Sequence, residues 1–143
     1  MATVFDVAKY ILNKNGDMST MKLQKLCYYS QAWSLVWDDK PLFEEEFEAW
    51  VNGPVCRELF NEHKGVFRIS QRDISGDINN LKKEQIETIN IVLDHYGNKD
   101  AQWLSTLTHM EKPWRDARSG FPDGYPCGAI ILKQNMADYY GSL

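Results

Sequence analysis

The segment from Thr20 to Trp37 constrains the fold most, because apolar residues cover nearly every side of the helix that it would form. One side of this helix would carry Leu23, Leu26, Cys27, Trp33 and Trp37. The apolar surface is widened by Tyr28, Tyr29, Ala32, Leu35 and Val36. A helix that is apolar nearly all round is usually central to its protein. We therefore predict a central helix over residues 20–37, which ends before Pro41 because proline disfavours helix at the preceding residue.

The remaining segments predict further helices separated by turns. Helical spacing and capping signals place them at residues 4–15, 54–64, 86–96, after Asp100 and at 132–140. Thr3 and Asp6 suit the start of the first helix, and Pro54 suits the first position of another. Alternating apolar residues allow a short strand or hairpin around residues 46–52 and 66–70, although a helical turn fits the first segment too. We expect a mainly α fold: a compact single domain, residues 1–143, of about six helices.

Charge and composition argue against several classes of protein. The chain has 143 residues and a net charge of −4 without a basic run, so we expect no nucleic-acid partner. The apolar stretch from Ala129 to Leu132 is too short to cross a bilayer, so we expect no membrane partner. Residues 1–3 lack the features of a signal peptide, which predicts a cytoplasmic protein with reduced cysteines. The acidic residues 44–48 form either a solvated surface or a patch that faces a basic partner.

The cysteines and histidines form no recognisable metal motif. Cys27, Cys56 and Cys127 lack CxxC spacing, and we expect them to be small, mostly buried thiols. Residues 109–111, followed later by Cys127, are similar to the signature of zinc deaminases. We reject that match because Ile130 stands where the second cysteine would be, and we predict neither a metal nor another cofactor.

Titratable and aromatic residues are dense between residues 108 and 118. His109 and Glu111 are close enough in sequence to act as an acid–base pair, with Arg118 nearby. They can equally form a structural hydrogen-bond network beneath Trp114. Since no nucleophile accompanies them, we predict a binding protein with no catalytic residues. An enzyme that uses His109, Glu111 and Arg118 remains the alternative.

Three ordered blocks of the chain resemble one protein family. Residues 22–31 closely resemble the KLQKLLYYAQ signature of Panacea-domain proteins, the SocA-like antitoxins, which include the GepA-type phage-associated proteins. Residues 41–43 and 48–55 look like the family's PLF…EAWxxGPV block, and residues 108–118 look like its THxExPWxxAR block. Two positions of the first block depart from the usual Leu and Ala, and the last helix follows the family pattern only loosely.

The resemblance implies a mainly helical fold and an antitoxin function within a toxin–antitoxin system. Such antitoxins bind a toxin protein encoded beside them, and one branch acts as a proteolytic adaptor that delivers its toxin to an AAA+ protease. A cognate protein toxin is therefore the implied partner, whereas the AAA+ protease and the oligomeric state stay open. The motif positions that become candidates for partner binding are Lys22, Gln24, Lys25, Tyr29, Gln31, Trp50, Gly53, Pro54, His109, Glu111, Trp114 and Arg118.

The residue types in these blocks suggest a structural role as well. Gln24 and Gln31 place amides on an otherwise apolar helix, and buried amides require hydrogen-bond partners. Trp50, Gly53 and Pro54 would form a rigid corner against that helix. We expect most of the motif to define the core, in which case the specificity for a toxin comes from other surface residues.

Overall fold

A computed structural model describes all residues from Met1 to Leu143. The fold is mainly α, as predicted, with seven helices where about six were expected. The helices are α1 (Val4–Asn15), α2 (Thr20–Trp37), α3 (Arg57–His63), α4 (Lys83–Tyr96), α5 (Ala101–Met110), α6 (Lys112–Ala117) and α7 (Lys133–Gly141). The strands are β1 (Met18–Ser19), β2 (Phe47–Trp50), β3 (Gly53–Cys56), β4 (Arg68–Ile69) and β5 (Ile130–Ile131), and 3₁₀ turns lie at Gln71–Asp73 and Ile78–Asn80.

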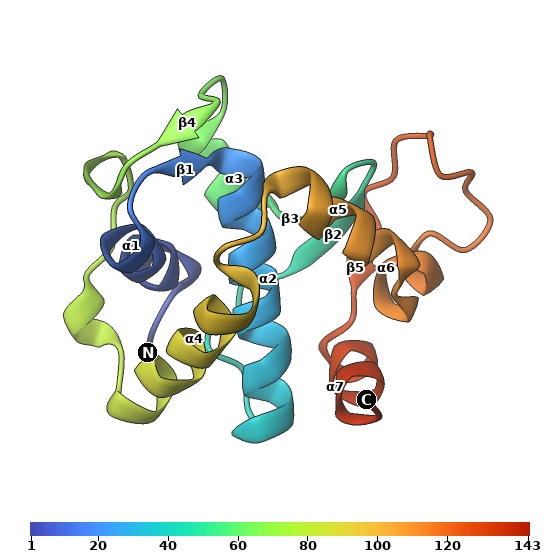
Figure 1. The fold of residues 1–143 in the computed structure, drawn as a ribbon. Coiled ribbons are helices and arrows are strands. Elements are labelled where there is room, and N and C mark those ends of the chain that lie inside the picture. Colours follow the sequence, from blue (N-terminus) through green and yellow to red (C-terminus); the bar gives the residue numbers. More distant parts are fainter.

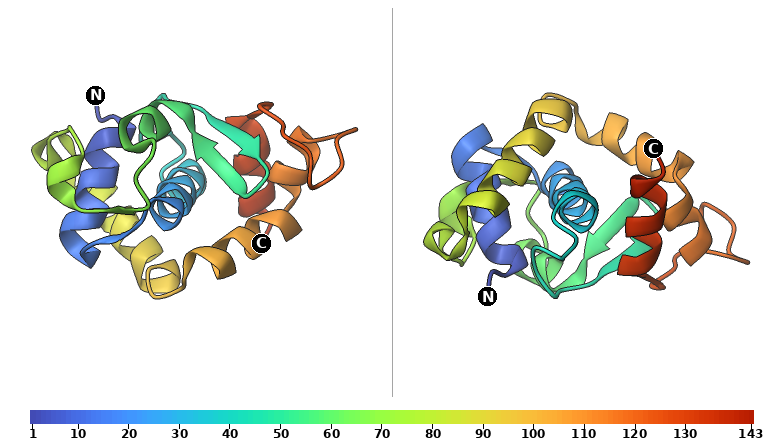
Figure 2. Two further views of the ribbon diagram at one scale, coloured as in Figure 1. Left: turned by 90° about the horizontal axis from the view of Figure 1, so that it is seen from above. Right: turned by 90° about the horizontal axis from the view of Figure 1, so that it is seen from below.

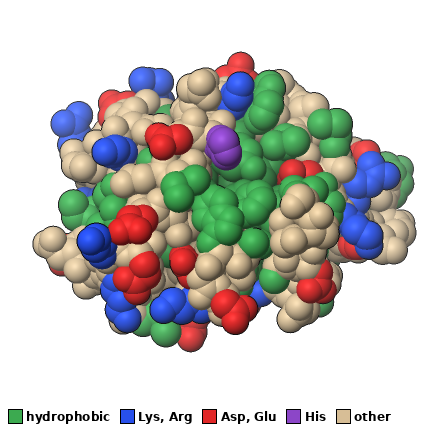
Figure 3. Space-filling model, turned by 60° about the horizontal axis from the view of Figure 1, so that its bottom comes forward, with side chains coloured by type: hydrophobic (Ala, Val, Ile, Leu, Met, Phe, Trp, Pro, Cys, Tyr) green, Lys and Arg blue, Asp and Glu red, His purple; other side chains and the backbone are tan.

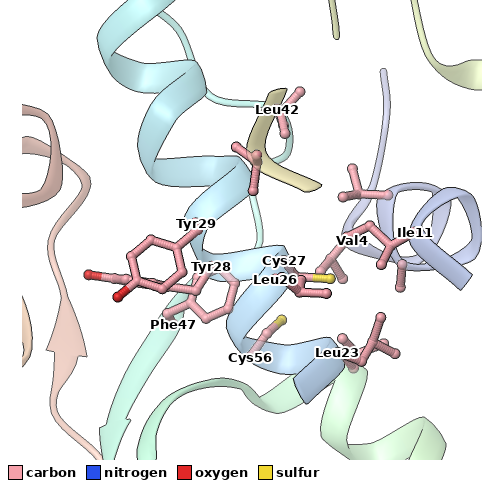
Figure 4. Packing of buried hydrophobic residues seen from close by; sticks show 14 of the residues in the cluster. Val4, Ile11, Leu23, Leu26, Cys27, Tyr28, Tyr29, Leu42, Phe47 and Cys56 are labelled. Atoms are coloured by element: carbon pink, nitrogen blue, oxygen red, sulfur yellow. The ribbon is translucent and has the colours of Figure 1, made fainter. Parts of the chain in front are cut away.

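Helix α2 runs through the centre of the molecule, as its sequence predicts (Figures 1 and 2). Leu23 and Leu26 are fully buried and belong to the same core as Ile11 of α1, whereas Tyr28 and Tyr29 extend toward the opposite side (Figure 4). Helices α4 and α7 pack along α2 as well. The α2 helix is therefore enclosed on nearly all sides, and the residues that it carries meet every other layer of the fold.

The C-terminal end of α2 differs from the prediction. Trp33 is only partly buried, and Trp37 is 44% exposed although both belong to the predicted apolar stripe. The two indole rings stack with their centroids 4.9 Å apart, and Trp33 Nε1 donates a hydrogen bond to the Tyr96 hydroxyl at 3.1 Å. Aromatic residues thus line the lower end of the central helix at the protein surface.

Two small antiparallel sheets complete the fold. In the larger sheet, β2 lies between β3 and β5, and Phe47 is opposite Cys56 of β3 and Ile131 of β5. In the smaller sheet, β1 pairs with β4 so that Met18 is opposite Ile69. The strands predicted around residues 46–52 and 66–70 are confirmed, and both are shorter than the predicted ranges.

The helix predicted to begin at Pro54 is wrong at its start. Pro54 lies in β3, opposite Ala49 of β2, and α3 begins only at Arg57. A proline is tolerated here because β3 is an edge strand of its sheet. Gly53 has a φ of 115° at the end of the hairpin turn, a conformation that favours glycine. The Gly53-Pro54 pair therefore belongs to a hairpin.

The predicted helix caps are confirmed. Thr3 and Asp6 form a capping box at the start of α1, and Asp100 accepts a hydrogen bond from the Trp103 main chain at the start of α5. Helix α4 ends at Tyr96, as the predicted range 86–96 does, and Gly97 follows it; the helix starts three residues earlier than predicted, at Lys83. None of the helices combines the length and apolar content needed to cross a membrane.

The glutamates of the acidic segment 44–48 contact different residues of the chain. Glu45 accepts a hydrogen bond from the Val4 main chain, and Glu46 forms an ion pair with Lys133 at 2.6 Å. Glu48 accepts two hydrogen bonds from Arg57, each at 2.9 Å. Two of the four glutamates, Glu46 and Glu48, are therefore paired with basic residues of the chain, which weakens the interpretation of the segment as a free acidic patch.

Candidate functional site

The three motif blocks come together around the β2–β3 hairpin. The first block lies on α2, the second includes the hairpin, and the third runs from the last three residues of α5 through α6 to the residue after it. Helices α2 and α5 both pack against β3, and α6 packs against β2. Blocks that are far apart in the sequence therefore surround one hairpin, and their side chains fix its position.

Gln24 fixes the edge of β3. Its Oε1 accepts a hydrogen bond from the Cys56 main-chain nitrogen at 2.8 Å, and its Nε2 donates to the Cys56 carbonyl at 3.2 Å. The same Nε2 lies 3.0 Å from Nε2 of His63, whose pKa is lowered by burial. The amide thus replaces the neighbouring strand that β3 lacks on this side, and the predicted partners of a buried amide are present.

Gln31 lies about two turns further along α2 and also bonds to main-chain groups, here those of the segment before β2. Its Oε1 accepts a hydrogen bond from the Leu42 nitrogen at 2.7 Å, and its Nε2 donates to the Phe43 carbonyl at 2.8 Å. These bonds attach the Pro-Leu-Phe segment, residues 41–43, to the central helix. Both glutamines therefore fasten main chain rather than offer a polar surface to a ligand.

Trp114 and Arg118 fasten the opposite strand of the hairpin. Trp114 Nε1 donates to the Trp50 carbonyl at 2.8 Å, and Arg118 donates to the Ala49 carbonyl at 2.7 Å. Arg118 also donates to the carbonyls of Pro122, Asp123 and Tyr125, and its guanidinium carbon lies 4.8 Å from the centre of the Trp114 ring. A single buried arginine thus connects β2 to the segment that precedes β5.

Glu111 belongs to a different cluster. Its Oε1 accepts hydrogen bonds from the hydroxyls of Tyr29 and Tyr140, both at 2.7 Å, and the Tyr140 hydroxyl lies 3.1 Å from that of Tyr28. Burial raises the pKa of Glu111 above its usual value, and the two tyrosine donors oppose that shift. This carboxylate joins α2 to α7 through a buried hydrogen-bond network.

His109 contacts neither this network nor a nucleophile. Its ring stacks on Trp114 with the centroids 4.1 Å apart, and burial lowers its pKa. Its Nε2 is buried without a hydrogen-bond partner. His109 and Arg118 both lie against the Trp114 ring, whereas Glu111 bonds to tyrosine hydroxyls, so the structure does not assemble the three into the acid–base site of the alternative prediction.

Lys25 is the unusual member of the motif. It is fully buried beneath the hairpin turn, its Nζ has no hydrogen-bond partner, and burial lowers its pKa to about 7. A Cβ added to Gly53 would lie 2.6 Å from Lys25 Cε and 2.9 Å from Thr108 Oγ1. The glycine is therefore required both by its backbone conformation and by the close approach of Lys25.

The remaining candidates lie at the margins of this cluster. Lys22 and Trp50 are partly buried, and partial burial lowers the pKa of Lys22 while Asp100 opposes that shift. Pro54 is buried in β3. Most of the candidate side chains are thus enclosed, which favours the structural role that the sequence suggested for them.

A pocket of about 550 Å³ opens beside this cluster, between the hairpin, α3 and the segments 65–66 and 126–128. We call it the hairpin pocket. Its apolar lining includes Met21, Trp50, Val55, Phe60, Val66 and Cys127. Gln24 and His63 contribute to its lining, and so does Arg57. The pocket could not be predicted from the sequence because its residues come from five separate segments.

A second apolar region lies on the opposite part of the surface. Figure 3 shows apolar side chains gathered near the middle of the face that includes the lower end of the molecule in Figure 1. The stacked pair Trp33 and Trp37, with Tyr96 bonded to Trp33, lies at this end of α2. We call these three residues the lower aromatic face. Met21 of the hairpin pocket and Trp37 are about 24 Å apart along the helix axis.

Comparison with known families identifies the chain. The family described as antitoxin SocA-like, Panacea domain, matches residues 23–115. The chain therefore belongs to the SocA-like, Panacea-domain antitoxin family, as the motif blocks predicted. The match includes the whole hairpin and Trp114, and it ends before Arg118. No significant match was found among curated proteins or among solved structures.

Proposed function

We propose that this chain is the antitoxin of a toxin–antitoxin pair and that it neutralises its toxin by binding it directly in the cytoplasm. The observation that carries this proposal is the family match over residues 23–115. Membership of an antitoxin family implies a protein partner, and we expect this partner to be the cognate toxin.

The arrangement of the motif residues supports a binding role. Gln24, Trp114 and Arg118 direct their polar atoms to main-chain groups of the hairpin and its neighbours. Such bonds hold a surface in a fixed shape, and a fixed surface loses little conformational entropy when a partner binds. The enzyme alternative receives no comparable support, because the Glu111 carboxylate bonds to tyrosine hydroxyls while His109 and Arg118 lie against Trp114.

Co-expression with the product of the neighbouring gene tests the proposal. We expect the chain to restore growth to cells that express this product and to co-purify with it as a stable complex. A folded His109→Ala variant should retain both properties, since the His109 ring stacks on Trp114 and its Nε2 is buried. Rescue without a complex, or loss of rescue in a His109→Ala variant that still binds, would contradict neutralisation by binding.

The same experiment separates simple neutralisation from proteolytic delivery. If the chain is an adaptor for an AAA+ protease, the amount of toxin should fall when both proteins are expressed and recover in a strain that lacks the protease. If the chain neutralises by binding alone, the toxin should accumulate in the complex. Immunoblots of the toxin in both strains distinguish these results.

A further inference from the structure

We propose that the hairpin pocket receives an uncharged apolar side chain that the toxin inserts. This inference rests on the proposed function, because it names the surface through which the antitoxin holds its toxin. The occupant is a protruding side chain of the toxin, with the size of leucine, methionine or phenylalanine.

The lining of the pocket favours an apolar group. Trp50 and Phe60 meet edge to face with their ring centroids 4.9 Å apart, and Met21 and Val55 add aliphatic surface. A volume of about 550 Å³ is sufficient for a large side chain together with part of its main chain. Burying such a side chain stabilises a complex in proportion to the apolar area removed from water.

Two polar side chains of the lining, Gln24 and Arg57, already have partners within the chain. The Gln24 amide bonds to both main-chain groups of Cys56 and to His63, so its donors and acceptor have partners within the chain. Arg57 pairs with Glu48 through two hydrogen bonds of 2.9 Å, and its guanidinium lies 5.2 Å from the centre of the Trp50 ring. A charged group entering the pocket would lose water without gaining a free partner among these side chains, which is unfavourable.

The surroundings of the pocket favour a protein over a small molecule. Apolar surface continues from Val66, which is 46% exposed, to Phe67, which is 79% exposed. On the other side, Cys127 in the lining follows closely after Tyr125, which is 62% exposed. A molecule confined to the pocket would leave both aromatic rings in water, whereas a protein that inserts one side chain would cover them with its surface.

The walls of the pocket are held in place before any partner arrives. Thr20 donates hydrogen bonds to the carbonyls of Val66 and Phe67 at 3.1 Å and 2.8 Å, which attach one rim to the start of α2. Trp114 holds the Trp50 carbonyl, and Arg118 holds the segment before Cys127 through the carbonyl groups already described. Binding therefore requires little reordering, which is the condition under which buried apolar area yields affinity.

Cys127 provides a probe inside the pocket. It is the partly exposed cysteine, whereas Cys27 and Cys56 are buried. Burial raises the pKa of Cys56 to about 12 and the pKa of Cys27 well above its usual value, so both thiols react slowly. N-ethylmaleimide should consequently modify Cys127 selectively and place a bulky group in the pocket.

The experiment measures toxin affinity and the labelling rate of Cys127 in the purified full chain. We expect treatment with N-ethylmaleimide to weaken toxin binding by the natural chain about tenfold or more. The same treatment should not alter the toxin affinity that the Cys127→Ser variant has before treatment. We also expect toxin to slow the labelling of Cys127. Phe67→Ser should lower affinity by a similar factor, and the matched control Ile91→Ser, which alters an apolar residue of α4 that is 47% exposed, should change it less than about twofold.

The possible results separate this inference from the proposed function. A toxin that binds the labelled chain with unchanged affinity, while Cys127 stays equally reactive in the complex, would overturn the pocket assignment and leave antitoxin binding intact. Cys127 that is protected before toxin is added, together with a small molecule released on denaturation, would also overturn it. A folded natural chain that binds no toxin would overturn both proposals.

Discussion

The hairpin pocket and the lower aromatic face both expose apolar side chains, yet they differ in how their surroundings are held. The pocket is concave, and Gln24, Trp114 and Arg118 bond directly to the main chain that forms its walls. The lower aromatic face is held chiefly by stacking of Trp33 on Trp37 and one hydrogen bond to Tyr96. Motif residues are thus concentrated where the surface is pre-organised. This difference identifies the pocket as the stronger candidate for recognition of a partner.

Replacement of Trp114 should have the largest effect on this comparison. Trp114→Ala removes a side chain that is 1% exposed and that holds the Trp50 carbonyl. We expect it to lower the free energy of unfolding by about 3–5 kcal/mol, since a large cavity forms and a carbonyl loses its partner. Chemical denaturation measures this change. A loss below about 1 kcal/mol would show that the hairpin is held by other contacts.

Loss of the Gln24 amide should have the next largest effect. Gln24→Leu retains the approximate size of the side chain but leaves the buried nitrogen and oxygen of Cys56 without partners. We expect a loss of about 2–3 kcal/mol in the free energy of unfolding and faster amide exchange in β3. Arg57→Ala is the matched control, because the Arg57 side chain is 55% exposed in its ion pair with Glu48, and its loss should lower the free energy of unfolding less than Gln24→Leu does. Equal losses in the two variants would contradict the role assigned to Gln24.

Lys25 makes stability beneath the hairpin depend on pH. Its pKa is about 7 in the folded chain and close to 10.5 when unfolded, so the unfolded state binds the extra proton between these values. The unfavourable effect of burying the ammonium is complete below pH 7 and decreases as the pH rises toward 10. We expect Lys25→Met to be more stable than the natural chain at pH 6, with the difference shrinking above pH 7 by at most about 1.4 kcal/mol per pH unit. Denaturation from pH 6 to 9 measures it, and parallel profiles would contradict the assignment.

Replacement of Trp37 should have the smallest effect. Trp37 is 44% exposed and stacks on Trp33, so Trp37→Ser should lower the free energy of unfolding by about 1 kcal/mol or less. Toxin affinity, measured by calorimetry, should remain within about twofold. A larger loss of affinity than in Phe67→Ser would reverse the comparison and place the partner on the lower aromatic face.

The central helix and its surroundings could be predicted because their signals are local. The all-round apolar pattern of residues 20–37 gave the bounds of α2 as observed, and the cap residues Thr3 and Asp100 marked true helix starts. The family blocks also predicted the residues that form the buried cluster. Gln24 and Gln31 obtained the hydrogen-bond partners that a buried amide needs, although the sequence could not name Cys56 or Leu42.

The hairpin and its pocket were harder to predict because they depend on contacts between distant segments. Pro54 is favourable both at the start of a helix and in an edge strand, and only the pairing of β3 with β2 decides between them. Strands β1 and β4 have two residues each, too few to show a period. His109 contacts Trp114, whereas Glu111 bonds to Tyr29 and Tyr140, and the close spacing of the two residues in the sequence does not reveal this separation.

Hydrogen–deuterium exchange of the full chain, alone and bound to the product of the neighbouring gene, tests the central claim most directly. Direct binding through the hairpin pocket predicts slower exchange in residues 50–56, 63–67 and 125–128, with residues 33–37 unchanged. Slower exchange confined to residues 33–37 and the neighbouring part of α4, or no change anywhere at saturating toxin, would contradict the account.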